Sequence, residues 1–581
     1  MRGFGGLLVI VLIAFFGAAQ LFVLPPEGWV TGDQGSKFLQ ARAFARNGPL
    51  NPGIDVLSRD LDPDYRYQEP KMKNRRGRLV SEFLWLLPLI TAPFYLIFGM
   101  RGLYVVPALS VMAIAMAAVA LGRRLTGTRG EWTPWLVVFA TPVVVYGLEY
   151  WEHAPAVACV MAAAVLGYPG GSGRWPDSVR SCAAGAAVGV GALFREEVAV
   201  ALPALVVARA VVVSDNRLRM LLSGGLWAAV GAGVVFVAAV PVNLLIYGAP
   251  LPMHMTQDAW EVAKAVPYWQ VRRDIVVALL FPAEHVRVFL TAATLGLCAG
   301  LVQMWRRQSS PAAQTDQSAR VLRWTVHCSV IIMVVIAAFL PIAKMALYGA
   351  RGDAYRLTSA AHTWIFALAL LYWPWFRDEV NRAGARFLIV LALLLILGTF
   401  VIVPTDGGSQ WSPRFFLAAA PLLAIVAGAA LLRRDGMPDA STHRYVAATV
   451  FLASMVMQAT GVGWIKHGKV HNARLVAWIG NETAPGDVLI SDVYWFPELI
   501  ATFAPTRRVL FSWTPGQVPA MAARAGAHGF RAFRIVTAPR LTGYEPPPVL
   551  DLPGAMCRYS RGQPIAVGEL LLVSEYSCEG S

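Results

Sequence analysis

Runs of apolar residues long enough to cross a bilayer recur from the N-terminus to about residue 464, and they constrain the fold more than any other feature. Lipid offers no hydrogen bonds to backbone groups, so a chain crosses it as helices of about 20 apolar residues or as a closed barrel. Only 15% of the residues are charged, whereas soluble domains average about 25%. The sequence therefore predicts an α-helical polytopic membrane protein. Its expected spans lie near residues 5–24, 103–122, 133–149, 154–169, 181–194, 198–213, 220–247, 275–304, 324–348, 359–376, 386–403, 414–432 and 444–464.

A further apolar run, residues 79–98, is ambiguous because Glu82, Pro88 and Pro93 interrupt it. If this run does not cross, the loops assigned to one side all carry Arg, while the opposite set is longer and holds most of the acids. The positive-inside rule then favours a re-entrant or interfacial helix at 79–98 and about 13 spans. We expect the cell inner (plasma) membrane, a cytoplasmic N-terminus that is an uncleaved anchor rather than a signal peptide, and an extracytoplasmic C-terminus.

From about residue 465 the composition changes, and helical stretches alternate with short strand-like runs at 488–491 and 508–511. This pattern predicts a small soluble α/β domain over 465–581 on the outer, periplasmic face. The membrane domain is then 1–464, with a first outer loop at 25–102. Cys557 and Cys578 lie in the hydrophilic tail and form a disulfide if that tail faces an oxidising compartment and the two residues meet, which the sequence does not show.

The formal net charge of +15 does not indicate a nucleic-acid partner. The arginines sit in short turns between apolar runs, as membrane topology requires. The sequence contains no Walker motif, no HExxH and no Ser-His-Asp arrangement that can be assembled, so ATP-driven transport is disfavoured.

Asp33 is an isolated acid just after the first apolar run, and it precedes an amphipathic stretch, "QGSKFLQARAFARN". One interpretation is that Asp33 caps this helix by accepting hydrogen bonds from its first amides. The other is that Asp33 is catalytic. The two are compatible, because a capping carboxylate is held in a fixed position.

The segment between the predicted spans 133–149 and 154–169 carries Glu149, Glu152 and His153. Glu149 and Glu152 are three residues apart, which would place them on one face of a helix. A metal site built on Glu152 and His153 is weakly supported, because adjacent residues of a helix point apart and no HxxxH or DxD pattern accompanies them.

Arginines near the outer ends of spans are candidate phosphate ligands, because guanidinium matches phosphate geometry. Arg195 is followed by two acids, so the alternative is a tight turn with a local ion pair. Arg414 stands at the mouth of a later span. Lys71 and Arg75 belong to the basic run "EPKMKNRRGR", for which a solvated or headgroup-binding patch is the alternative.

Several stretches, taken in order, resemble the GT-C class of integral-membrane glycosyltransferases, in particular those that use polyprenyl-phosphate sugars and are related to protein O-mannosyltransferases and aminoarabinose transferases. The resemblance covers about residues 25–430. The stretches that carry it are "GDQGSKFLQARAFARNGPL", "LITAPFYLIFGMRGLYVVPALSVMAIAMAAVALGRRLTG", "AAVGVGALFREE", "VPVNLLIYGAPLP" and "GGSQWSPRFFLAAAPLLAI".

This resemblance implies that a sugar is moved from a polyprenyl-phosphate donor in the membrane to an extracytoplasmic glycan, lipid or protein acceptor, with inversion. It implies Asp33 as general base. Arg195 and Arg414, and after them Lys71 and Arg75, would bind the donor phosphate. Glu149, Glu152 and His153 fall in the second-loop region, where the family often has acceptor- or metal-binding acids.

Gln34 departs from the family pattern, which commonly has a second acid at this position. Glutamine is neither a base nor an anionic metal ligand, so we expect no metal and no cofactor. The alternatives are a transporter or lipid flippase, which would place ionisable residues near span centres, and a non-catalytic scaffold with the same fold. The charges here cluster at one membrane face, which favours chemistry at that face.

Overall fold

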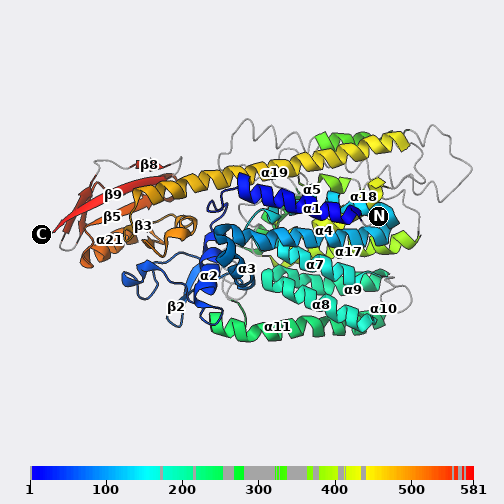
Figure 1. The fold of residues 1–581 in the computed structure, drawn as a ribbon, viewed down its shortest axis with the longest axis horizontal. Helices are drawn as coiled ribbons and strands as arrows, with labels where there is room; N and C mark the ends of the chain where they lie inside the picture. Colours follow the sequence, from blue (N-terminus) through cyan, green and yellow to red (C-terminus); the bar gives the residue numbers. More distant parts are fainter. Residues whose placement is uncertain are drawn as a thin grey trace, which may run out of the picture. The chain divides into compact units, whose positions relative to one another are not determined.

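The computed structural model shows a mostly helical chain with a β-sheet near its C-terminus (Figure 1). The chain divides into two compact units, which are described separately. The first comprises residues 1–18, 106–239 and 258–464, and the second comprises 19–105, 240–257 and 465–581. The described residues are 3–169, 175–212, 217–252, 267–280, 321, 324–325, 327–335, 363–368, 370, 379–403, 411–412, 414–432, 440–552, 555–560, 565–567 and 571–580.

The first unit is built from apolar helices, and α4, α11 and α19 continue from it into residues of the second unit. Helices pack in pairs, some of them distant in the sequence: α7 lies beside α8, α9 beside α17, and α17 beside α18 (Figure 1). The helices are α1 (Gly3–Ala18), α4 (Val105–Thr126), α5 (Thr133–Phe139), α6 (Val143–Gly147), α7 (His153–Gly167), α8 (Asp177–Phe194), α9 (Ala201–Val212), α10 (Arg217–Arg219), α11 (Gly225–Tyr247), α13 (Tyr268–Leu280), α17 (Glu379–Ile402), α18 (Ala419–Leu432) and α19 (Ala440–Glu482).

Glycines allow α8 and α11 to pack backbone against backbone. A Cβ atom at Gly185 would lie 1.9 Å from the carbonyl oxygen of Ala228, and one at Gly231 would lie 1.9 Å from that of Cys182. Lipid tails are as apolar as the helices, so the hydrophobic effect does not drive helices together in a membrane. Small residues at the contacts let the backbones approach closely and pack instead.

Among the described residues, four helical stretches are long and apolar enough to cross a membrane: Leu86–Thr126, Arg217–Tyr247, Ala383–Ile402 and Tyr445–Glu482. Three shorter apolar helices accompany them. The expected class, an α-helical polytopic membrane protein, is confirmed. The predicted spans at 275–304 and 359–376 lie largely outside the described residues, so the total of about 13 stays a prediction.

The ambiguous run at 79–98 does not form one helix. Its first residues belong to strand β2 (Arg78–Ser81), which pairs with β1 (Met72–Arg75), and the helix α3 (Leu86–Phe98) begins later. At 13 residues, α3 is about 20 Å long, well short of a 30 Å hydrocarbon core. Gly99 then reverses the chain with φ = 59°, so the following 3₁₀ turn, Gly99–Tyr104, folds back on α3.

The second unit contains α2 (Asp33–Asn47), the β1–β2 hairpin and a seven-stranded mixed sheet. Strands β4, β3 and β5 are parallel, and β9, β7 and β6 continue the sheet in antiparallel order, with β8 paired to β9. Both predicted strands, 488–491 and 508–511, are present as β3 and β4. The strands are β3 (Val488–Ser491), β4 (Arg508–Phe511), β5 (Ala532–Thr537), β6 (Val549–Leu552), β7 (Ala555–Tyr559), β8 (Ile565–Val567) and β9 (Leu571–Gly580), and the helices beside them are α20 (Phe496–Leu499), α21 (Val518–Ala527) and α22 (Pro539–Thr542).

The first outer loop supplies part of the core of this C-terminal domain. Leu61 is fully buried in the same hydrophobic cluster as β3, β4 and β5. The N–H of Phe511 donates to the carbonyl of Tyr67 at 2.7 Å, and Arg508 forms an ion pair with Asp60. Residues 57–67 and 465–581 therefore fold as one body, although some 400 residues separate them in the sequence.

Cys557 and Cys578 are joined by a disulfide. They face each other directly on the neighbouring strands β7 and β9, and Cys557 is fully buried in the domain core. The sequence placed both residues in one domain, but only the strand register brings them together.

We expect the double variant Cys557→Ser, Cys578→Ser to unfold more easily, because the crosslink closes a loop of 21 residues in the unfolded chain and contributes about 3 kcal/mol. Denaturant unfolding of the purified protein, followed by fluorescence, measures this loss. Reductant should lower the wild-type midpoint and leave that of the variant unchanged. An unchanged midpoint in the variant would contradict the prediction.

Candidate functional site

Asp33 is the first residue of α2, and the residue before it, Gly32, occupies the N-cap position. The side-chain Oε1 of Gln34 accepts the backbone N–H groups of Val30 at 2.7 Å and Thr31 at 3.3 Å, two residues that precede the helix. Gln34 is fully buried, whereas Asp33 is half-exposed. The residue that departs from the family pattern thus holds the entry to the helix, and the carboxylate of Asp33 lies at its positive end.

Helix α20 of the C-terminal domain packs directly on this first turn of α2. A Cβ atom at Gly32 would lie 1.4 Å from Oε2 of Glu498, and one at Gly35 would lie 1.9 Å from the carbonyl oxygen of Glu498. At Gly35 the obstacle is backbone, so a side chain there would require α20 to move, whereas at Gly32 it is the end of the Glu498 side chain, which a substitution would displace. Asp33 is therefore placed by the C-terminal domain as well as by its own helix.

Three further carboxyl groups gather near Asp33, and all three are buried: Glu69, Glu82 and Glu498. The hydroxyl of Ser36 donates to Oε1 of Glu69. Glu82 forms ion pairs with Lys71 at 2.9 Å and Lys73 at 3.5 Å. The negative charge of Glu82 is thus compensated, whereas that of Glu69 meets only a hydroxyl among its identified hydrogen-bond partners.

Burial raises the pKa of Glu69 to about 8, and the nearby carboxylates of Glu82 and Asp33 add to the rise, against the Ser36 hydrogen bond and Lys71, which lower it. Burial likewise raises the pKa of Glu498, with Glu69 and Asp33 adding to it. Two acids in one desolvated site do not both ionise readily. At neutral pH this site therefore holds protons on buried carboxyls next to the half-exposed Asp33.

Lys71 and Arg75 lie in the same unit as Asp33 but differ in surroundings. Lys71 is compensated by Glu82, and its ammonium is 6.0 Å from the centre of the Phe83 ring. Arg75 is the last residue of β1, opposite Arg78 at the closed end of the hairpin. Their predicted roles in phosphate binding stay predictions.

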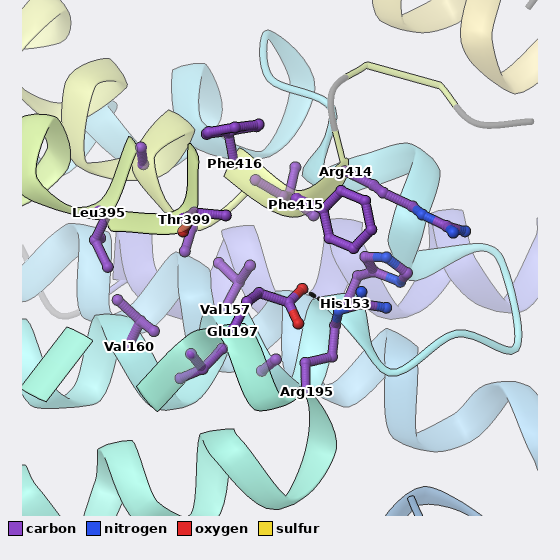
Figure 2. A pocket seen from close by; sticks show the side chains of 15 residues that line it. His153, Val157, Val160, Arg195, Glu197, Leu395, Thr399, Arg414, Phe415 and Phe416 are labelled. Atoms are coloured by element: carbon purple, nitrogen blue, oxygen red, sulfur yellow. Dashed lines mark hydrogen bonds and ion pairs between the residues drawn. The ribbon is translucent and has the colours of Figure 1, made fainter. Parts of the chain in front are cut away.

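In the first unit, Arg195 lines a pocket between α7, the turn that follows α8, α17 and the segment that leads into α18, as Figure 2 shows. The pocket is small, with a cavity volume of about 20 Å³, and it is partly open to solvent. Arg195 is buried and donates from Nη1 to Glu152 at 2.7 Å and from Nε to Glu197. The local ion pair considered as an alternative is therefore present, and a second acid from the neighbouring loop joins it.

Arg414 lines the same pocket (Figure 2). The guanidinium carbons of Arg195 and Arg414 each lie 5.3 Å from the centre of the Phe415 ring, a distance at which an aromatic face attracts a cation. The two predicted phosphate ligands are thus brought together around one phenylalanine.

A buried polar network fixes the chain just before Arg414. Ser412 adopts φ = 67°, an unusual conformation for a side-chain-bearing residue. Its hydroxyl accepts from Thr363 at 2.8 Å and from Trp364 at 3.0 Å, and the hydroxyl of Tyr146 donates to the carbonyl of Trp411 at 2.6 Å. These contacts hold a backbone conformation that the sequence around Arg414 does not dictate.

The expectation that Glu149 and Glu152 share a helix face is wrong. Helix α6 ends at Gly147 and α7 begins at His153, so both acids lie in an irregular segment. Glu149 is fully buried, Glu152 precedes α7 and pairs with Arg195, and the ring of His153 lies 4.9 Å from that of Tyr146. The predicted span failed as a single helix because Pro142, which has no N–H to donate, separates α5 from α6.

The carboxylates described above do not form a metal site. Within the part of the chain that the structure describes, no three His, Cys, Asp or Glu side chains converge closely enough to hold one ion. The second unit instead offers a half-exposed carboxylate beside proton-holding acids, an arrangement suited to proton transfer. The first unit offers two arginines beside an open pocket, an arrangement suited to an anion.

Sequence reasoning missed Glu69 and Glu498 and used Glu82 only as an interruption of an apolar run. Glu498 had the same signal as Asp33, an isolated acid within an apolar stretch, "YWFPELIATF". Because Glu498 is far from Asp33 along the chain, nothing in the sequence indicates that the two acids lie close together.

We expect the Glu69→Gln variant to gain stability relative to wild type as the pH rises from about 4.5 to 8. In wild type the folded pKa is raised to about 8 from an ordinary 4.5. The stability of the folded state is therefore lost progressively across this window, at up to about 1.4 kcal/mol per pH unit. Glutamine retains the acceptor for Ser36 and carries no proton to lose. Thermal unfolding at pH 5 and pH 8 measures the difference, and a pH-independent difference would show that Glu69 is ionised.

No protein-family model matches this sequence, and no curated protein matches it. Solved structures do match the fold. The structure of ArnT from Cupriavidus metallidurans bound to undecaprenyl phosphate is similar with a TM-score of 0.50 at 14% identity, over 98% of this chain and 97% of that one. The apo state of the same protein gives a TM-score of 0.50 at 15% identity over the same shares of each chain. At these identities the likeness concerns the fold, and it agrees with the order of motifs: the chain has the fold of the GT-C glycosyltransferases.

Proposed function

We propose that this protein is a membrane glycosyltransferase that moves a sugar from a polyprenyl-phosphate donor to an extracytoplasmic glycan, lipid or protein acceptor, with inversion. The observation that carries the proposal is the match to ArnT over nearly the whole of both chains, in a structure that holds undecaprenyl phosphate. The chemistry of the residues supports it independently.

Asp33 is the general base of this proposal. Its carboxylate takes the proton of the acceptor hydroxyl while that oxygen attacks the anomeric carbon of the sugar. The bond from the anomeric carbon to the phosphate oxygen breaks, and its electron pair leaves with the polyprenyl phosphate. Support comes from the half-exposure of Asp33 and from its place at a helix N-terminus, which favours a negatively charged carboxylate.

The leaving phosphate needs cationic stabilisation more than a proton. Arg195 and Arg414 are our candidates, because they line one pocket that opens to solvent and flank one aromatic ring. Glu152 and Glu197 hold the Arg195 guanidinium in a fixed orientation. Lys71 and Arg75 are further candidates in the second unit.

The proposed orientation places the C-terminal domain outside the cytoplasm, with the N-terminus inside. The disulfide between Cys557 and Cys578 supports this orientation, because structural disulfides persist in oxidising compartments.

We expect Asp33→Asn to reduce transfer at least about 100-fold, since a positioned general base contributes roughly that factor or more. The assay uses membranes supplied with a polyprenyl-phosphate sugar pool and compares glycan product at equal protein abundance. Asp64→Asn is the matched control, because Asp64 is an exposed acid of the same outer loop. Normal product from Asp33→Asn at normal protein abundance would refute the assignment of Asp33 as general base.

Arg195→Lys should raise the apparent KM for the lipid donor about tenfold or more, because lysine keeps the charge but loses the planar set of donors. Arg209→Lys is the control. Arg209 is also buried and bonded to a hydroxyl and a carboxylate, Ser181 and Asp177, but does not line the pocket of Figure 2. Equal effects of the two substitutions would show that Arg195 acts only through folding.

A further inference from the structure

Glu498 is the acid that the C-terminal domain brings to the first turn of α2. It is the third residue of α20 and only 2% exposed. Glu498 lies directly against Gly32 and Gly35. A Cβ atom built on Gly32 would lie 1.4 Å from the Oε2 atom of Glu498, and one built on Gly35 would lie 1.9 Å from its carbonyl oxygen. This contact lies within one compact unit, so the carboxyl group of Glu498 is a fixed neighbour of the Asp33 turn.

The surroundings of Glu498 disfavour a negative charge. Its Oε1 atom is buried and has no hydrogen-bond partner among the described residues, and the same holds for Oε2 of Glu69. The charged and titratable groups that act on Glu498 are Glu69, Asp33, Lys71 and Glu82, and of these Glu82 and Lys71 neutralise each other. A buried carboxylate without a hydrogen-bond donor is strongly disfavoured and takes up a proton instead.

We propose that Glu498, together with Glu69, holds a proton beside Asp33, so that the negative charge of this site is confined to Asp33 and the C-terminal domain is part of the reaction centre. The inference rests on the proposed function, because Glu498 acts only through Asp33, the proposed general base. Glu498 is a positioning residue: it does not take the proton of the acceptor, but its neutral form keeps a second negative charge away from Asp33.

An acid held this close to the base is harmless while protonated and repels the base once ionised. As the pH rises and Glu498 loses its proton, two like charges meet in a site that α20 and α2 close tightly. Transfer should therefore fall at alkaline pH in the wild-type protein.

The first test is the pH profile of transfer by Glu498→Gln in the full-length protein. Glutamine mimics the protonated acid at every pH, so the ratio of transfer at pH 9 to transfer at pH 7 should rise at least about threefold over wild type. Glu545→Gln, which removes an exposed acid of the same domain, should keep the wild-type ratio. A Glu498→Gln profile that superimposes on that of wild type overturns the role.

The second test is infrared spectroscopy of the same proteins, which needs no activity. The absorption of a protonated carboxyl group should be present in wild type at pH 7 and weaker in Glu498→Gln. Its persistence at full strength overturns the proton assignment. If Glu498→Gln does not fold, Glu69→Gln should show the same two changes, and their absence counts against the proposal equally.

The two tests also separate this inference from the proposed function. If the wild-type protein shows no transfer at any pH, the proposed function fails, and the link to Asp33 fails with it. The infrared result then still decides whether Glu498 holds a proton. If transfer occurs and the carboxyl band is unaffected by Glu498→Gln, only the further inference fails.

Discussion

The contact between the first turn of α2 and helix α20 is the interaction on which the second unit depends. It joins a loop near the N-terminus to a domain near the C-terminus, and Gly35 permits the close approach to the backbone of α20, while Gly32 leaves room for the Glu498 side chain. Around it, Leu61 enters the core of the sheet and Tyr67 pairs with β4. The first outer loop and the C-terminal domain therefore share one hydrophobic core, to which Leu61 and Tyr67 of the loop contribute.

Buried ionisable side chains in this protein are stabilised in two different ways, by ion pairing and by protonation. In the first unit Arg195 is buried as an ion, and two carboxylates compensate it, because an uncompensated buried charge is costly. In the second unit Glu69 and Glu498 have too few donors to be buried as ions, so they hold protons. Asp33 differs from both groups, since it is half-exposed at a helix N-terminus and its charge is favoured by solvent and by the helix dipole.

Local patterns predicted elements well where one physical requirement dominated. Apolar length predicted the spanning helices, and short strand-like runs between helical stretches predicted β3 and β4 at their observed bounds. Prediction from local patterns failed where a helix-breaking residue or a tertiary contact determined the structure. Pro142 split one expected helix and left Glu149 and Glu152 in an irregular segment, and Glu82 ended a strand rather than interrupting a helix. Arg195 and Arg414 could be singled out as outer-face arginines, but no local pattern places both beside Phe415.

The sequence by itself determined that this chain is a polytopic helical membrane protein with a C-terminal α/β domain, because the need for internal hydrogen bonds in lipid selects long apolar runs, and the succession of short strand-like and helical runs is typical of an α/β domain. It also singled out Asp33 as a candidate, since an isolated acid in an apolar chain stands out. The tertiary structure alone decided that Glu69, Glu82 and Glu498 gather beside Asp33, that Gln34 holds the helix entry, and that Cys557 meets Cys578. These pairings join residues that are in several cases hundreds of positions apart. They depend on which surfaces must be buried together, and that is a property of the folded chain rather than of any segment of it.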